Sequence, residues 1–132
     1  MKHVVDTHAL IWFLEGNSRL GANARTILSE ADSQLILPVI ALAEAVWIVE
    51  RGKTSIPSVT ALLSAVSADC RVMVYPLDWA VIDQSINLGT IHEMHDRQIV
   101  STALVLQNQG ETVRVLTCDQ NITAPGLVPI VW

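Results

Sequence analysis

Short apolar runs of two kinds alternate along the chain, and this alternation constrains the fold more than any other feature. Some runs are brief and rich in β-branched residues, which is typical of buried strands. Others are longer and place apolar residues at helical spacing. Strands that alternate with helices favour a parallel sheet covered by helices. The sequence therefore predicts an α/β fold, and its length of 132 residues predicts one domain over residues 1–132.

The predicted elements follow one another closely. We expect strands over residues 3–6, 34–37, 71–75, 112–117 and 128–131. We expect helices over residues 7–14, 22–31, 39–51, 57–68, 79–88 and 95–107. Pro57 is expected to lie in the first turn of its helix, where proline is favoured.

The composition excludes several classes of protein. Apolar residues make up 51% of the chain and charged residues only 16%, which excludes a disordered protein. No apolar run approaches the ~20 residues of a membrane span. The first residues lack the pattern of a signal peptide, so we expect a cytoplasmic protein. The net charge of −5 is unusual for a nucleic-acid binder, but two bound divalent cations would bring it near zero.

Two aspartates follow predicted strands. Asp6 closes the run at residues 3–6, and Asp119 lies just beyond the run at residues 112–117. Ligands of open parallel sheets bind at the carboxyl ends of strands, so both carboxylates can converge there. The structural alternative is that Asp6 caps a helix and Asp119 forms a turn. The residues alone leave both interpretations open.

Glu44 lies in the middle of an apolar helix. On a 3.6-residue period it shares a face with Ile40, Trp47 and Ile48. A carboxylate buried among apolar side chains is costly unless it is paired or binds a metal. We therefore expect Glu44 to be a ligand. The alternative is that it reaches the edge of the helix and pairs with an arginine.

Asp96 begins another apolar helix. It shares a face with Ile99, Val100 and Ala103, which predicts that its carboxylate points inward. An acid in the first turn also stabilises the helix dipole, which is the structural alternative. Glu93, just before this helix, is a further and weaker candidate ligand.

Four inward carboxylates are hard to explain by structure alone in a chain with so few charges. Two like charges about 4 Å apart repel by roughly 4 kcal/mol at an effective dielectric of about 20. Such a cluster needs cations to stay ionised, and oxygen ligands without Cys or His favour Mg²⁺ or Mn²⁺. The usual chemistry of these sites is phosphodiester hydrolysis, because the metal activates water and stabilises the leaving oxygen. The predicted ligands are Asp6, Glu44, Asp96 and Asp119.

The acids lie in four stretches that resemble one family. These stretches are Val4–Leu10, Leu37–Glu44, His95–Leu104 and Leu116–Asp119. In order and spacing they resemble the PIN-domain ribonucleases, specifically the VapC-type toxins of bacterial or archaeal toxin–antitoxin pairs. The resemblance implies a three-layer sandwich with a central parallel sheet, and Mg²⁺- or Mn²⁺-dependent endonucleolytic cleavage of RNA. It also implies a homodimer and inhibition by a cognate antitoxin protein.

The same resemblance assigns roles to individual residues. It places the family's four catalytic acids on the predicted metal ligands Asp6, Glu44, Asp96 and Asp119. It places Thr117 where it would orient a ligand or a metal-bound water. Thr7 and Arg97 are further candidates for binding or orienting the substrate. For Arg97 two roles stay open, namely contact with the scissile phosphate and pairing with a site carboxylate.

The chain also departs from the family pattern. Met94–His95 stands where many members carry Pro–Ala, which could alter the loop beside the substrate. A second acid two residues from Asp119 is absent, because position 117 is Thr and position 121 is Asn. We therefore expect one metal ion in the resting state.

Two other classes of function stay open. One is a metal-binding, PIN-like interaction module with little or no nuclease activity. The other is a different Mg²⁺-dependent phosphoryl hydrolase, although a phosphatase of this type would need a second Asp where His8 stands. The tryptophans are expected to pack in the core or at a dimer interface, with base stacking as the alternative for one that lines the site. They are Trp12, Trp47, Trp79 and Trp132.

Overall fold

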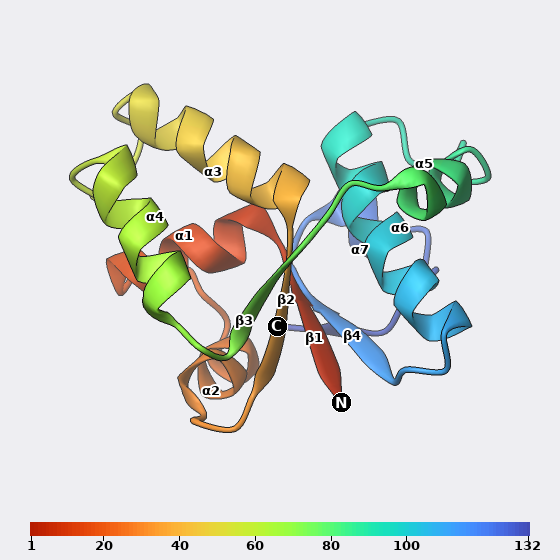
Figure 1. Ribbon diagram of the computed structural model, residues 1–132, viewed down its shortest axis with the longest axis horizontal. Helices are drawn as coiled ribbons and strands as arrows, with labels where there is room; N and C mark the ends of the chain where they lie inside the picture. Colours follow the sequence, from red (N-terminus) through yellow and green to blue (C-terminus); the bar gives the residue numbers. More distant parts are fainter.

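The computed structural model describes all 132 residues and contains one five-stranded sheet in which every pair of neighbouring strands is parallel. The strand order is β3-β2-β1-β4-β5, so β1 is central and β4 lies beside it (Figure 1). This confirms the predicted α/β fold. The strands are β1 (Lys2–Val5), β2 (Gln34–Pro38), β3 (Val72–Tyr75), β4 (Val113–Leu116) and β5 (Ile130–Val131).

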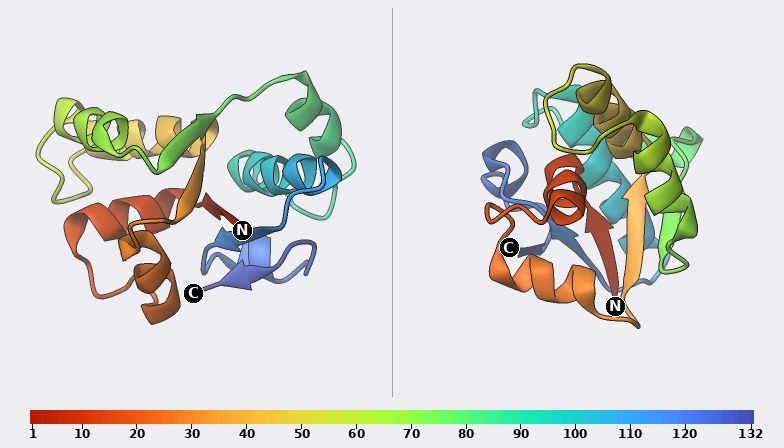
Figure 2. Two further views of the ribbon diagram at one scale, coloured as in Figure 1. Left: turned by 60° about the horizontal axis from the view of Figure 1, so that its bottom comes forward. Right: turned by 90° about the vertical axis from the view of Figure 1, so that its left-hand side faces the viewer.

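Helices cover both faces of the sheet. The chain moves in one direction from β1 to β3 and in the other from β3 to β5. Because such crossovers are right-handed, the first four helices lie on one side and the last three on the other (Figures 1 and 2). This is the three-layer sandwich expected from the resemblance. The helices are α1 (Thr7–Glu15), α2 (Ala22–Ser29), α3 (Val39–Glu50), α4 (Val59–Ala68), α5 (Trp79–Ser85), α6 (Met94–Asn108) and α7 (Gln120–Thr123).

Some element ends differ from the prediction for local reasons. Helix α4 begins at Val59 because Ser58 caps it, with the Ser58 Oγ accepting from the Ala61 N–H at 3.0 Å. Pro57 therefore precedes the cap rather than lying in the first turn. Helix α5 ends at Ser85, three residues before the predicted end. The short helix α7 was not predicted.

Apolar packing fixes the elements that carry the candidate site. Val4 of β1, Val115 of β4, and Val100 and Ala103 of α6 have no exposed surface. They belong to one core that joins the sheet to its helices. Side chains at the ends of β1, β4 and α6 are therefore held on rigid supports. No helix is long and apolar enough to cross a membrane.

Candidate functional site

The candidate site lies where the sheet changes its direction of winding. Strands β1 and β4 are neighbours, and their following connections leave toward opposite edges of the sheet. Val5 pairs with Leu116, so Asp6 and Thr117 begin the two connections side by side. The Asp6 N–H donates to the Leu116 carbonyl at 3.3 Å. Ligands of open α/β sheets bind at such a switch point, beyond the carboxyl ends of the strands.

Thr117 connects the ends of the two strands. Its hydroxyl donates a hydrogen bond to Oδ2 of Asp6, and both residues are buried. The same oxygen accepts from the Asp119 N–H at 3.0 Å. One buried hydroxyl thus holds the Asp6 carboxylate and fixes the backbone that carries Asp119. This contact agrees with the orienting role that the resemblance implies for Thr117.

Asn121 connects Asp119 to Asp96. The Asp119 Oδ1 accepts from the Asn121 N–H at 2.8 Å, and the Asn121 Nδ2 donates to Oδ2 of Asp96 at 3.1 Å. Asp96 is only 6% exposed, which confirms that it points inward. Sequence reasoning noted Asn121 only as a missing acid. The sequence signal for this bridging role was the position of Asn121, two residues after an aspartate that follows a strand.

Along this series of hydrogen bonds, the negative charge of each aspartate makes ionisation of its neighbours less favourable. Burial raises the pKa of Asp6, and the Asp119 charge adds to the shift, while Thr117 and the His8 charge oppose it. Burial raises the pKa of Asp96 to about 6, with the charges of Asp119, Asp6 and Glu93 adding to the shift. The same two effects, burial and the charges of Asp6 and Asp119, raise the pKa of Cys118. This edge of the sheet is therefore a region of negative potential that a cation would relieve.

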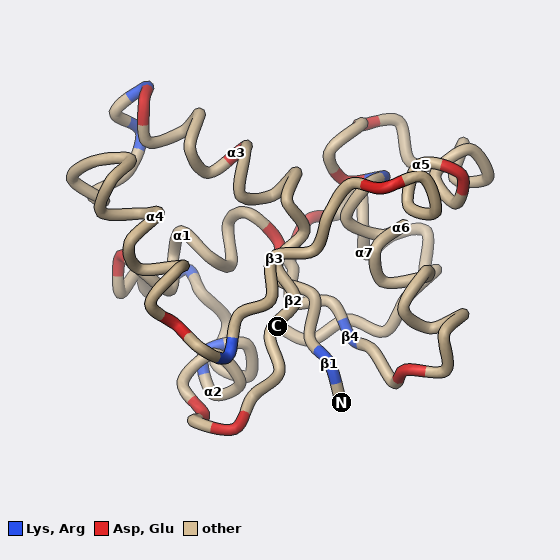
Figure 3. The backbone as a smooth tube through the Cα atoms, viewed as in Figure 1, with Lys and Arg blue, Asp and Glu red and all other residues tan.

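All three aspartates lie at helix N-termini. Asp6 precedes α1, Asp119 caps α7, and Asp96 is in the first turn of α6. Figure 3 shows acidic positions from separate elements gathering where these helices begin. The partial positive charge of a helix N-terminus stabilises a carboxylate by a few tenths to about 1 kcal/mol. The Asp119 side chain caps α7 by accepting from the Asn121 N–H, whereas the Asp6 side chain makes no cap hydrogen bond and accepts from Thr117 instead.

Glu44 does not lie where the sequence predicts. The buried face of α3 is formed by Ala41, Ala45 and Val49, and the Glu44 side chain is 27% exposed. Its Oε2 lies 3.8 Å from Nδ1 of His95 at the start of α6. The expectation that Glu44 is buried among apolar side chains is therefore wrong. Glu44 lines a hollow with Ala43, Trp47 and His95, and it makes no hydrogen bond to the aspartates.

Glu93 and His95 lie at the start of α6, close to Asp96 in the chain. Glu93 is the N-cap of α6, and its Oε1 lies 2.8 Å from Nδ1 of His95. The hydrogen bonds from His95 lower the pKa of Glu93, whose side chain is 51% exposed. Glu93 therefore adds negative charge near Asp96.

Of the two roles considered for Arg97 from the sequence, the structure contradicts pairing with a site carboxylate. The Arg97 Nε donates to the Ile91 carbonyl at 2.7 Å, which ties the connection before α6 to the helix. Arg97 forms no salt bridge with a site carboxylate. Its two terminal guanidinium nitrogens have no protein partner. Thr7 is fully buried at the start of α1, and its hydroxyl has no hydrogen-bond partner in the protein.

Comparison with models of known protein families identifies the family of this chain. The family model described as the PIN domain matches residues 3–125. The chain belongs to the PIN domain family. No curated protein matches its sequence significantly.

Two solved structures show the same PIN fold at low sequence identity. One is a chain of VapBC2 from Rickettsia felis bound to a DNA fragment from their promoter, with 16% identity and a TM-score of 0.73. That match covers 100% of this chain and 99% of the other. The second is VapC20 from Mycobacterium tuberculosis, a sarcin–ricin loop cleaving toxin, with 17% identity and a TM-score of 0.65. It covers 96% of each chain.

The donor chemistry of this PIN domain fits a hard divalent cation. Two buried aspartates with raised pKa values face Asp119, and no Cys or His belongs to their chain of hydrogen bonds. No three His, Cys, Asp or Glu side chains lie close enough together to hold one ion as they stand. The predicted four-carboxylate cluster is therefore not preassembled. Mg²⁺ does not require such a cluster, because it keeps several waters and binds through one or two carboxylates.

Proposed function

We propose that this PIN domain is a Mg²⁺- or Mn²⁺-dependent endoribonuclease and acts as the toxin of a toxin–antitoxin pair. The observation that carries the proposal is the chain of hydrogen bonds from Asp6 through Thr117, Asp119 and Asn121 to Asp96 at the switch point. The likeness of the fold to a sarcin–ricin loop cleaving toxin supports RNA as the substrate class.

Each residue has a role that follows from its position. Asp6, Asp96 and Asp119 would hold the cation, and Glu44 would complete its ligands from the facing helix α3. When bound, the metal would activate water and stabilise charge on the phosphate. Thr117 keeps the Asp6 carboxylate in place through its hydrogen bond, which limits the reorganisation needed at reaction.

The substrate phosphate needs a positive group beside this acidic edge. Arg97 follows Asp96 directly, and its Nε is anchored on the Ile91 carbonyl. Both terminal guanidinium nitrogens remain available, and a planar guanidinium is well suited to bind a phosphate with two hydrogen bonds. We therefore assign Arg97 to the scissile phosphate rather than to a carboxylate.

Exposed apolar side chains support the proposed protein partners. Trp79 and Ile82 of α5 and Ile86, its C-cap, follow one another at helical spacing and are 85%, 43% and 72% exposed. A contiguous apolar face on a small protein typically marks an interaction surface. We propose that this face forms the homodimer. A cognate antitoxin is a separate partner, and the likeness to a chain of VapBC2 supports it.

The test is cleavage of a structured RNA with Mg²⁺ or Mn²⁺ by wild type and by Asp6→Asn. We expect at least a hundredfold loss of rate in the variant and no cleavage by wild type in EDTA. Circular dichroism confirms that the variant is folded. Equal cleavage by the two proteins would refute the proposal.

A further inference from the structure

A hollow between α3 and α6 has no role in the proposed chemistry beyond that of Glu44. It is lined by Ala43, Glu44 and Trp47 of α3 and by His95 of α6. Glu44, a proposed ligand of the cation, lines this hollow and lies 3.8 Å from His95, which directly precedes Asp96, so the hollow shares a residue with the proposed cation site. A group bound in the hollow would lie next to the reacting centre.

Trp47 is the largest side chain in this hollow and is not needed for the core. Its side chain lies on the opposite part of the helix from the buried Ala41, Ala45 and Val49, and it is 53% exposed. Exposed indoles are uncommon in monomeric surfaces because they leave a large apolar area in water. A role in binding would explain why a tryptophan occupies this position.

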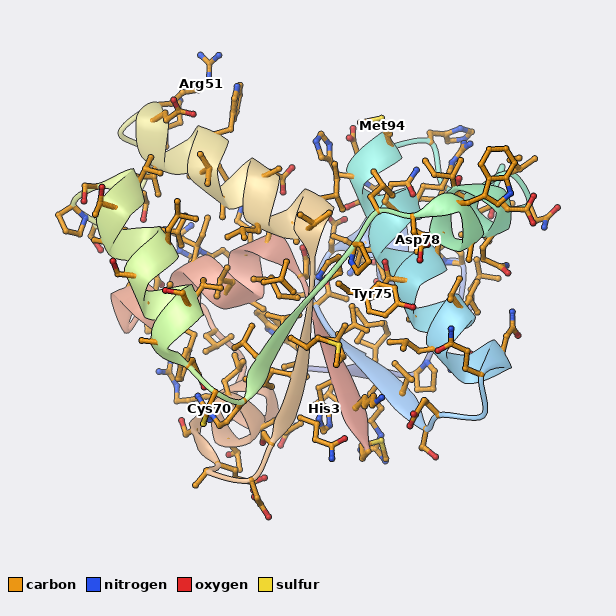
Figure 4. All side chains as sticks on the ribbon, viewed as in Figure 1. His3, Arg51, Cys70, Tyr75, Asp78 and Met94 are labelled. Carbon is orange, nitrogen blue, oxygen red and sulfur yellow. The ribbon has the colours of Figure 1, made fainter.

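The indole ring is held from one side by a cation. The Arg51 Cζ lies 3.9 Å from the centroid of the Trp47 ring, which is a close cation–π contact. Figure 4 shows Arg51 just past the outer end of α3 and Met94 at the start of α6, the two helices that contribute to the hollow. Arg51 thus restrains the ring and places positive charge next to it, which offsets the Glu44 carboxylate for an approaching anion.

We propose that Trp47 stacks on an unpaired nucleobase of the RNA, next to the scissile phosphate. The inference rests on the proposed function, since it names a further contact of the same substrate. Every nucleobase has a π-face, so stacking on tryptophan tolerates any sequence but requires a base outside a duplex. Trp47 would therefore select single-stranded segments and loops, while Arg97 holds the neighbouring phosphate.

The inference is tested by RNA binding without cleavage. The probe is a fluorescein-labelled oligoadenylate of about 12 nucleotides, followed by fluorescence anisotropy in EDTA with the full chain. Trp47→Phe keeps an aromatic face, whereas Trp47→Leu keeps only apolar bulk. Leu63→Ala is the positional control, because Leu63 is an exposed apolar side chain of α4, 42% exposed, outside the hollow and outside the proposed dimer face. Unfolding curves confirm that all variants are folded.

We expect Trp47→Leu to weaken binding at least about fivefold, from the usual contribution of base–aromatic stacking. Trp47→Phe and Leu63→Ala should stay within about twofold of wild type. Equal affinity of Trp47→Leu and wild type, an equal loss in Leu63→Ala, or no binding by wild type would each overturn the inference.

A parallel cleavage assay separates this inference from the proposed function. Loss of binding in Trp47→Leu together with no cleavage by wild type in Mg²⁺ or Mn²⁺ would refute the nuclease and leave the stacking contact standing. Cleavage by wild type with an unchanged KM and kcat in Trp47→Leu would refute the stacking contact alone. The inference predicts a raised KM for the oligonucleotide with little change in kcat.

Discussion

Replacing Asp96 by Asn should stabilise this PIN domain when no divalent cation is present. Asp96 is 6% exposed and faces the charges of Asp119 and Asp6, so its ionised form is disfavoured in the folded protein. Asparagine has nearly the same shape, removes the charge, and keeps an oxygen that can accept from the Asn121 Nδ2. The change therefore removes repulsion while preserving the local contact.

The size of the effect follows from the pKa of Asp96, which is about 6 in the folded protein. An unfolded aspartate titrates near 3.9, and each unit of difference corresponds to about 1.4 kcal/mol, so the upper limit is about 3 kcal/mol. The substitution also buries an amide N–H₂ group, and a buried donor without an acceptor destabilises the fold. The net gain in the free energy of unfolding is therefore smaller than this upper limit. We expect the free energy of unfolding to rise by about 1–2 kcal/mol at pH 7.5, or Tm to rise by about 3–8 °C.

The dependence of stability on pH follows from the direction of the Asp96 pKa shift. The folded protein binds the Asp96 proton more tightly than the unfolded chain does, because its pKa is raised. Protonation therefore favours folding, and the Asp96 contribution to stability falls as pH rises from about 4 to about 6. The stability advantage of Asp96→Asn should grow over this window and stay constant above it.

Chemical denaturation in EDTA between pH 4 and pH 8 measures both quantities. Saturating Mg²⁺ should then reverse the order of stability, since a ligand at about 100 times its Kd adds roughly 2.7 kcal/mol to the wild type alone. An Asp96→Asn variant that is no more stable than wild type at pH 7.5, with the same dependence on pH, would refute the reasoning.

Three further predictions follow from other residues of the structure. Thr117→Val should lower the free energy of unfolding by about 1–3 kcal/mol and reduce the rate of cleavage, because Asp6 loses its buried hydrogen-bond donor. Thr117→Ser keeps the hydroxyl and should retain most of the stability and most of the cleavage rate. Glu44→Gln should weaken Mn²⁺ binding but change the free energy of unfolding in EDTA by less than about 0.5 kcal/mol, because the side chain is partly exposed; a larger loss of stability would show a structural role. Ile86→Asp should convert a dimer to a monomer in sedimentation velocity, and an unchanged dimer would place the interface elsewhere.

The sequence predicted where Asp6, Asp96 and Asp119 lie, because these positions depend on secondary structure. Asp6 and Asp119 follow strands, and parallel strands end at one edge of a sheet, so their proximity needed no knowledge of side-chain packing. The inward direction of Asp96 followed from helical spacing in α6, where one face carries Ile99, Val100 and Ala103.

The burial of Glu44 could not be predicted in the same way. Helix α3 is apolar on nearly every side, so hydrophobic spacing does not show which face packs on the core. The structure buries the small residues Ala41 and Ala45, which allow close approach to neighbouring elements, and leaves Trp47 outside. Asn121 was missed because a bridging amide depends on the short helix α7, which has no periodic signal at that length.

The measurement that tests the central claim most directly is calorimetric titration of Mn²⁺ into wild type, Asp6→Asn and the control Glu111→Gln. Glu111 carries a comparable charge but pairs with Lys2 on the surface, 2.9 Å away. If the aspartates at the switch point hold the cation, Asp6→Asn weakens Mn²⁺ binding at least about tenfold and Glu111→Gln binds like wild type. Equal Mn²⁺ affinity in all three proteins would contradict a metal site at the ends of β1 and β4.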